Sequence, residues 1–187
     1  MAEPFHTLTA LGHQTPELME IGPYRINERF DVALASVAVR RGREADVSER
    51  AASARIALPG PARWVAADPW SAFWVAPDMW FVEAPFATHE DIASHLKSAF
   101  GDAASVSEQT DAWIRLDLSG QALPALLERL SNVDLAQVPD GFATRTMIEH
   151  LGCYLIRKSA TEVTIYGARS SAASLLHALE TTAKSLL

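Results

Sequence analysis

The sequence predicts an α+β fold in which an antiparallel-rich sheet is covered by helices. Three observations support this prediction. Short runs rich in β-branched and aromatic residues are separated by tight-turn signals, as in antiparallel hairpins. Runs with apolar residues at helical spacing lie between these hairpins. The chain then closes with a predicted hairpin and an amphipathic helix, a unit that buries its apolar stripe by lying on a sheet.

The chain is predicted to begin with an N-terminal arm over residues 1–29, followed by a single α+β domain over residues 30–187. Proline and glycine interrupt the arm at Pro4, Pro16, Gly22 and Pro23. Its scattered apolar residues are nevertheless too many for a simple linker. We therefore expect the arm either to pack on the domain or to be held by a partner.

The domain is expected to open with a buried strand over residues 30–39 and a helix over residues 44–57. The strand is apolar along most of its length, which is typical of burial on both faces. The helix carries an alanine-rich face that permits close approach to a sheet. Pro59 and Pro61, with Gly60 between them, end this helix.

An aromatic hairpin follows within residues 64–86, which hold four of the five tryptophans. Strands are predicted over residues 71–76 and 79–83, joined by a Pro77-Asp78 turn. Alternation places Phe73 on one face of the hairpin and Trp74 on the other, so that neither face is polar. We expect one face to fill the core and the other to contact the arm or another subunit, since exposed tryptophan clusters mark binding sites. The candidate subunit-interface residues here are Phe73, Trp74, Trp80 and Phe81.

The middle of the domain alternates helices and strands. The expected elements are a helix over residues 88–100, strands over 105–109 and 112–118, and a helix over 122–130. Thr88 is the predicted N-cap of the first helix. In the second strand, Arg115 and Asp117 alternate with apolar residues, which is typical of a half-buried strand with polar side chains facing solvent.

The closing unit is predicted from residue 147 onward. Residues 147–157 and 162–166 form two β-capable runs around a short polar turn and are expected to pair as a hairpin. Ser170 or Ser171 then offers an N-cap for the last helix. Apolar residues recur at helical spacing along it, at Ala172, Leu175, Leu176, Leu179, Ala183 and Leu186.

Composition restricts the partners and the compartment. The net charge of −7 argues against nucleic acid, because phosphates attract a basic face. The lone Cys153 excludes an internal disulfide framework and sits in an apolar run, which predicts a buried thiol. No secretory signal is visible, and no apolar run approaches the ~20 residues of a membrane helix. We therefore expect a soluble, cytoplasmic protein with no membrane contact.

The residues that carry chemistry in other proteins are absent here as motifs. The sequence contains no dinucleotide fingerprint, P-loop, CxxC pair, HExxH or GxSxG. Asp111, Asp117 and Glu128 sit where a surface strand or helix needs polar residues. No catalytic, cofactor-binding or metal-binding residue is predicted, and the chain is expected to be a binding or assembly module.

Three stretches, in this order, resemble the γ subunit of heterotetrameric sarcosine oxidase, a member of the aminomethyltransferase-like superfamily. They are residues 76–82, residues 109–120 followed by residues 126–127 and 133–135, and residues 144–146 together with the closing strand, the Tyr166-Gly167-Ala168-Arg169-Ser170 turn and the last helix. The resemblance covers residues 30–187 and leaves out the arm. One departure is Leu175-Leu176, where many relatives have a tryptophan. Gly152-Cys153-Tyr154 is similar to a signature of a folate-binding iron–sulfur-assembly branch, but the flanking residues differ and that branch is rejected.

The resemblance implies a fold similar to the N-terminal part of glycine-cleavage aminomethyltransferase and a non-catalytic role. The implied complex oxidatively demethylates sarcosine to glycine, with formation of hydrogen peroxide and methylenetetrahydrofolate. No cofactor is implied for this chain, because FAD, FMN, NAD, tetrahydrofolate and zinc belong to the other subunits. The implied partners are the α, β and δ subunits, chiefly the α-like one, or a second copy when this chain is isolated.

Two arginines flank the closing hairpin and complete the predicted interface residues: Arg145 and Arg169. Either each binds backbone carbonyls or a nearby acid such as Asp134 or Asp140, or one is kept for an acidic group of the partner. Two other functions stay open. One is the same role in a dehydrogenase for another N-methyl amino acid, such as N-methylglutamate. The other, less favoured, is a stand-alone folate-binding aminomethyltransferase, which needs further domains.

Overall fold

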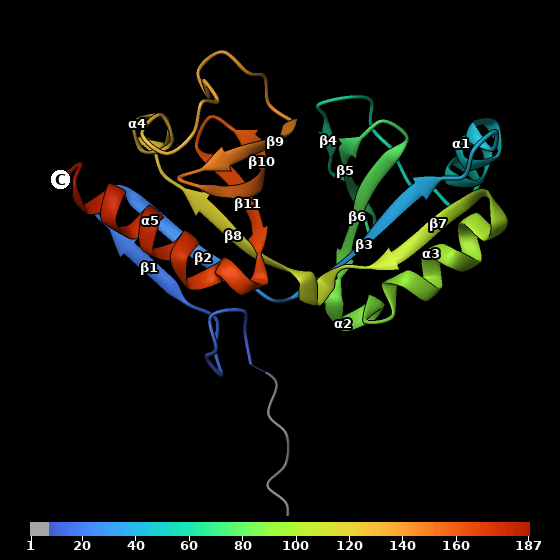
Figure 1. Cartoon of the computed structure of the whole chain (residues 1–187), viewed down its shortest axis with the longest axis horizontal. Helices are drawn as coiled ribbons and strands as arrows, with labels where there is room; N and C mark the ends of the chain where they lie inside the picture. Colours follow the sequence, from blue (N-terminus) through green and yellow to red (C-terminus); the bar gives the residue numbers. More distant parts are fainter. Residues whose placement is uncertain (1–7) are drawn as a thin grey trace, which may run out of the picture.

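The chain folds into two antiparallel sheets that lie side by side, each with helices on its outer face (Figure 1). This computed structural model describes residues 8–187, so that residues 1–7 of the predicted arm lie outside the described part. The predicted α+β class, with antiparallel strands and covering helices, is confirmed. The division of the strands between a six-stranded and a five-stranded sheet is a feature that the sequence analysis did not predict.

The six-stranded sheet contains the chain's first two strands and its last four. In spatial order these are β1 (Leu18–Ile21), β2 (Tyr24–Arg29), β8 (Trp113–Ser119), β11 (Glu162–Ala168), β10 (Leu151–Ser159) and β9 (Phe142–Ile148). Helices α4 (Leu123–Leu127) and α5 (Ala172–Lys184) cover its outer face and share one apolar core with it. Gly167 on β11 permits this close approach, because a Cβ there would lie 2.6 Å from a Leu175 methyl group.

The five-stranded sheet is formed by the segment between β2 and β8. In spatial order its strands are β4 (Trp64–Val65), β5 (Ser71–Ala76), β6 (Met79–Pro85), β3 (Val32–Val39) and β7 (Ala104–Glu108). Its outer face is covered by α1 (Glu44–Ser53) and α3 (Ile92–Phe100), and the short α2 (Phe86–His89) follows β6. Asp91 caps α3 by accepting from the Ser94 backbone N–H. The 3₁₀ turns are Gly101–Ala103, Thr110–Ala112 and Arg169–Ser171.

The chain crosses between the sheets at two adjacent places. It passes from β2 to β3 at residues 30–31 and returns from β7 to β8 through the 3₁₀ turn Thr110–Ala112. Because β2 pairs with β8 and β3 pairs with β7, the two crossings run alongside each other. The Thr110 hydroxyl accepts from the Leu34 backbone N–H at 2.9 Å at this junction. The five-stranded half is therefore inserted within the six-stranded one.

Three sequence predictions need correction. Residues 18–29 are not an arm, because they form β1 and β2, and Tyr24 and Ile26 are buried in the core of the six-stranded sheet. The single strand predicted over residues 147–157 is a hairpin of β9 and β10, with Glu149 at a positive φ in its turn. The helix predicted over residues 88–100 is divided into α2 and α3, so that Asp91 and not Thr88 caps the longer helix.

A third apolar core lies between the two sheets and is largely aromatic. Phe73, from β5, is fully buried there and contacts Phe81, Tyr154 and Tyr166, with ring centroids 5.4–5.7 Å apart. Cys153 is buried in the core of the six-stranded sheet, where burial raises the pKa of its thiol to about 11. This confirms the predicted buried thiol.

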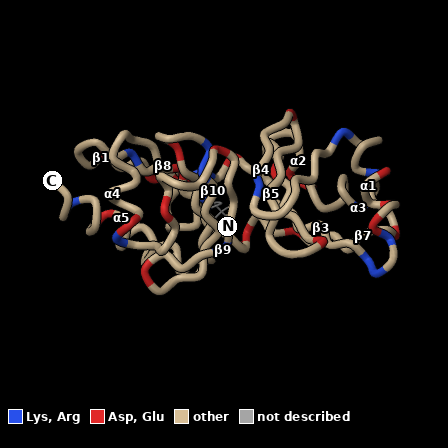
Figure 2. Tube along the Cα trace, turned by 90° about the horizontal axis from the view of Figure 1, so that it is seen from above, with Lys and Arg blue, Asp and Glu red and all other residues tan. Residues whose placement is uncertain are grey.

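Charged residues of both signs are spread over both halves of the molecule (Figure 2). Between residues 8 and 187, none of the helices combines the length and the apolar character that crossing a membrane requires.

Candidate functional site

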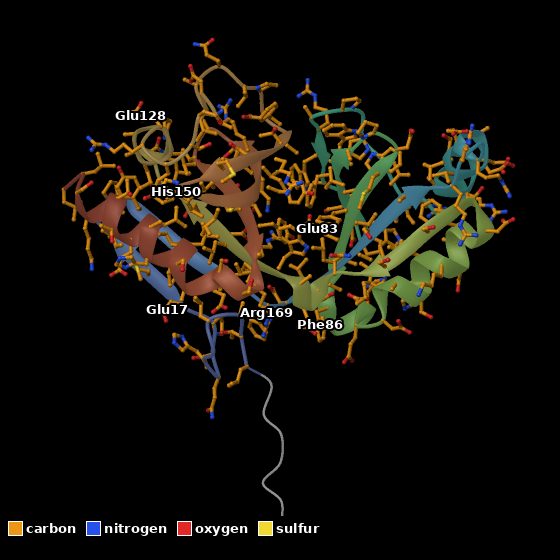
Figure 3. The ribbon with its side chains drawn as sticks, viewed as in Figure 1. Glu17, Glu83, Phe86, Glu128, His150 and Arg169 are labelled. Carbon is orange, nitrogen blue, oxygen red and sulfur yellow. The ribbon has the colours of Figure 1, made fainter. Side chains whose placement is uncertain are left out.

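The candidate site is a set of charged side chains that face each other across the space between the two sheets. Because side chains alternate along a strand, Glu83 on β6 and Arg115 on β8 point inward while their strand neighbours fill the outer cores. The side chains of Glu83 and Arg115 are only 6% and 10% exposed. Figure 3 shows Glu83 in the middle of the molecule, between the halves.

Glu83 is the acceptor at the base of this site. Its Oε1 accepts from Arg115 Nη1 at 3.1 Å and from the Tyr166 hydroxyl, and its Oε2 accepts from Trp64 Nε1 at 3.4 Å. Burial is the largest effect on Tyr166 and raises the pKa of its phenol well above the ordinary value. Burial lowers the pKa of Arg115, but Tyr166, Glu83 and Asp117 raise it more, so Arg115 stays charged. The cluster therefore ties β6 of one sheet to β8 and β11 of the other.

Asp117 forms ion pairs with cationic side chains of the six-stranded sheet. It accepts a bidentate pair from Arg115 at 3.0 and 3.1 Å and a third bond from Arg29 Nη1 at 3.1 Å. The Thr164 hydroxyl donates to it at 2.5 Å. Burial raises the pKa of Asp117, but the attraction of Arg115 and the bonds that it donates lower it more, and the net shift is downward. Asp117 is therefore a carboxylate whose acceptor positions are already occupied.

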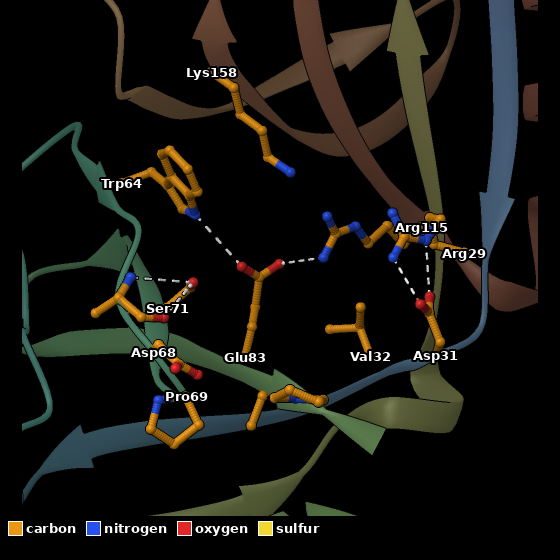
Figure 4. Close-up of a pocket in the computed structure, with 13 residues that line it drawn as sticks. Arg29, Asp31, Val32, Trp64, Asp68, Pro69, Ser71, Glu83, Arg115 and Lys158 are labelled. Atoms are coloured by element: carbon orange, nitrogen blue, oxygen red, sulfur yellow. Dashed lines mark hydrogen bonds and ion pairs between the residues drawn. The ribbon is translucent and has the colours of Figure 1, made fainter. Parts of the chain in front are cut away.

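A cavity of about 250 Å³ opens beside this cluster (Figure 4). The indole of Trp64 lies on one side of it, and the side chain of Lys158 reaches in from β10. Lys158 Nζ lies 5.4 Å from the centroid of the Trp64 ring. Arg29 sits at the far side in a bidentate pair with Asp31, at 2.8 and 2.7 Å. The cavity thus combines one aromatic wall with cations that come chiefly from the six-stranded sheet.

Three carboxylates in and beside the cavity, those of Asp31, Glu83 and Asp117, are each engaged by an arginine, whereas Asp68, which also lines it, forms no ion pair with the described residues. Charge-assisted bonds of this kind are roughly twice as strong as neutral ones and fix the two sheets against each other. In the described part of the chain, no group of three or more His, Cys, Asp or Glu residues is placed to hold a metal ion.

The predicted aromatic interface residues divide between the two faces of the hairpin. Phe73 and Phe81 are 0% and 3% exposed in the core between the sheets, so the prediction that they contact a partner is wrong. Trp74 and Trp80 lie opposite each other on the other face and are half-buried. Trp80 Nε1 donates to the Pro59 carbonyl at 2.7 Å. The two tryptophans remain candidate interface residues.

The two predicted arginines have different environments. Arg169 Nη2 donates to the carbonyls of Leu8 and Thr9 at 2.9 and 3.2 Å, and its Nη1 pairs with Asp111 at 3.5 Å. It therefore fastens the start of the described chain to the six-stranded half and lines a second cavity of about 530 Å³. Arg145 lies exposed on the edge strand β9 and forms no ion pair with the described residues.

Replacing Arg169 with lysine is expected to lower the melting temperature of the isolated chain slightly. Lysine cannot span both carbonyls and Asp111, and loss of such bonds costs ~0.5–1.5 kcal/mol, at the lower end here because the side chain is partly exposed. Thermal unfolding followed by circular dichroism measures the change. Arg145→Lys is the matched control and should leave the melting temperature unchanged. Equal melting of both variants and the wild type would show that Arg169 does not hold the segment.

Sequence reasoning missed the members of the inter-sheet cluster. Arg115 and Asp117 were interpreted as the solvent side of a half-buried strand, yet they face the other sheet. The available signal was Glu83, a lone acid in an otherwise apolar run that requires a buried cation as partner. Arg29 and Lys158 gave no local signal, because their roles depend on the way in which the sheets face each other.

No protein-family model matches the chain, and no curated protein matches its sequence. Among solved structures, a chain of the heterotetrameric sarcosine oxidase from Corynebacterium sp. U-96 is similar with a TM-score of 0.78 and 18% identity, over 90% of this chain and 88% of that one. Glycine cleavage system aminomethyltransferase T from Bartonella henselae is similar with a TM-score of 0.59 and 13% identity, over 81% of this chain and 44% of that one.

These likenesses define the class of fold as aminomethyltransferase-like. The fold expected from the resemblance is thereby confirmed. This chain spans less than half of the aminomethyltransferase but nearly all of the matched sarcosine oxidase chain.

Proposed function

We propose that this chain is the non-catalytic, γ-type subunit of a heterotetrameric sarcosine oxidase, with a structural role in assembly. The observation that carries the proposal is the similarity in fold to a chain of such an oxidase, over 90% of this chain and 88% of that one. The likeness to the aminomethyltransferase is weaker, with a TM-score of 0.59 over 44% of that enzyme.

In this proposal the chemistry belongs to the partner subunits. They bind FAD, FMN, NAD, tetrahydrofolate and zinc, demethylate sarcosine to glycine, and form hydrogen peroxide and methylenetetrahydrofolate in the cytoplasm. This chain carries no cofactor and contacts chiefly the α-like subunit. The exposed Arg145 on β9 and the half-buried Trp74 and Trp80 are the candidates for this contact. A partner bond of Arg145 predicts that Arg145→Lys speeds dissociation of the complex without lowering the melting temperature of the isolated chain.

The proposal is tested by expressing the flavin-binding partner chains with and without this chain. Omission should reduce the yield of assembled oxidase and the sarcosine-dependent formation of hydrogen peroxide. The isolated chain should show neither flavin absorbance nor oxidase activity. A stoichiometric flavin spectrum or sarcosine oxidation by the isolated chain would exclude the non-catalytic role.

The same preparation decides the substrate of the complex. Sarcosine should be oxidised faster than N-methylglutamate at equal concentration. The reverse order would keep the assembly role but assign the complex to N-methylglutamate.

A further inference from the structure

Lys158 differs from the other cations of the inter-sheet cavity because it lacks a hydrogen-bond acceptor. Its side chain is only 22% exposed and points from β10 into the cavity (Figure 4). The nearest carboxylate oxygen, Asp117 Oδ1, lies 3.9 Å from Nζ, which is beyond hydrogen-bond distance. Within residues 8–187, Nζ donates no hydrogen bond. The ammonium group is held by the charge of Asp117 and by the Trp64 ring, and its hydrogen-bond donors stay free for a further partner.

The acids closest to Lys158 are already engaged by arginines, and Asp68, the lining acid that no arginine engages, lies more than 4.0 Å from Lys158 Nζ. Asp117 accepts from both Arg115 and Arg29, and Asp31 is held in a bidentate pair by Arg29. Glu83 faces Arg115, Tyr166 and Trp64. Three cations and three acids line the cavity, and among the cations Lys158 is the one whose donors are free to bind an anionic group.

The electrostatics of Lys158 agree with this description. Burial is the largest effect that lowers the pKa of Lys158; Arg115 lowers it further, and Asp117 opposes the change. These effects vanish in the unfolded chain, so unfolding takes up a proton between the folded and unfolded pKa values. The free energy of unfolding should therefore rise with pH through that window. A bound anion would favour the charged form of Lys158 and raise its pKa.

We infer that the inter-sheet cavity binds a small carboxylate with an attached flat apolar group, and that Lys158 pairs with its carboxylate. The ammonium group and the Trp64 ring, 5.4 Å apart, supply the two complementary surfaces. Val32, Pro69, Ala84 and Pro85 add apolar lining. A volume of about 250 Å³ accommodates a molecule the size of an aromatic ring with one carboxylate. This inference goes beyond the proposed assembly role and does not depend on it.

Titration of the isolated full-length chain with benzoate, followed by isothermal calorimetry, tests the inference. Benzamide, which has the same ring and no charge, is the control probe. Benzoate should bind saturably and benzamide at least tenfold more weakly, because the neutral amide cannot form a charge-assisted pair. Lys158→Met should weaken benzoate binding by roughly tenfold or more, and Lys158→Arg should restore part of it.

The chain contains three lysines, so ¹³C-lysine labelling gives a second readout. The lysines are Lys97, Lys158 and Lys184. Benzoate should shift one Cε signal, absent in Lys158→Met, and raise its titration midpoint. Lys97→Met, at an exposed position on α3, is the matched control and should bind benzoate normally. The melting temperature of Lys158→Met should be no lower than that of the wild type. If Lys158→Met is destabilised, Lys158→Gln replaces it in the binding measurement.

Three outcomes would overturn the inference: no saturable benzoate binding by the wild type, equal binding of benzamide, or undiminished binding by both Lys158→Met and Lys158→Gln. If no free carboxylate binds but Lys158→Met loosens an assembled complex, the cavity receives a carboxylate side chain of a partner, and the small-molecule inference is wrong. The calorimetry uses the isolated chain, so its failure would leave the proposed assembly role untouched.

Discussion

Replacing Phe73 with alanine is expected to destabilise the folded chain by about 3–5 kcal/mol. Phe73 is fully buried between the sheets and contacts Phe81, Tyr154 and Tyr166. Its removal leaves a cavity that the rings of both sheets border, and the sheets cannot close over it without losing their own packing. Urea unfolding followed by circular dichroism measures the loss.

Trp74→Ala is the matched control, since the neighbouring side chain lies half-buried on the other face of the same strand. Its loss of stability should be smaller. A Phe73→Ala loss below about 1 kcal/mol would mean that the cavity collapses readily and that the aromatic core does not join the two sheets.

Replacing Arg115 with methionine is expected to cost about 3–5 kcal/mol, because it leaves Glu83 and Asp117 without their common cation in a buried site. The double variant Arg115→Met/Glu83→Gln should regain part of this loss, since one uncompensated charge is removed. Urea unfolding of the wild type and both variants at pH 7 gives the comparison. An Arg115→Met chain as stable as the wild type would show that the cluster does not hold the halves together.

The loss of stability in the Arg115→Met variant should also depend on pH. Although burial raises the pKa of Asp117, Arg115 and its bonds lower it more, so Asp117 stabilises the fold above its unfolded-state pKa. That contribution is lost as pH falls through the lower, folded-state pKa. Arg115→Met removes most of this contribution of Asp117. The difference in free energy of unfolding between the variant and the wild type should therefore become smaller as the pH falls. If the difference in free energy of unfolding stays constant from neutral pH to below the pKa of Asp117, Arg115 does not stabilise the Asp117 carboxylate in this way.

The sequence predicted best those elements whose boundaries are marked by local signals. Pro77 and Asp78 form a recognisable turn, and the strands on both sides of it were predicted almost to the residue. The turn between β9 and β10 at Glu149 and His150 contains neither glycine nor proline, so an apolar run concealed it. Local turn chemistry therefore decided which hairpins could be recognised.

The prediction of an N-terminal arm was wrong for a related reason. Pro16, Gly22 and Pro23 suggested irregular chain, yet Tyr24, Ile26 and Glu28 alternate as buried residues of β2. Buried Glu28 accepts from the backbone N–H groups of Leu11 and Glu17 at 3.1 and 3.0 Å and so holds the preceding segment. A period-two pattern was present, but the turn residues around it outweighed it.

The inter-sheet site was beyond local prediction because it depends on which faces of two sheets meet. An arginine on one strand and a glutamate 32 residues earlier gave no sign that they would form a buried pair. The aromatic hairpin shows the same limit. Its two apolar faces were predicted from alternation, but only the tertiary structure shows that Phe73 and Phe81 fill the core and that Trp74 and Trp80 lie on the other face.

The central claim, that this chain is an assembly subunit of an oxidase, is tested most directly by the native mass of the particle recovered through a tagged copy of the chain. The proposal predicts a heterotetramer that contains one copy of this chain and three different partner chains, with bound flavin. Recovery of the chain alone, as a monomer or a homo-oligomer without any flavin-binding chain, would contradict it.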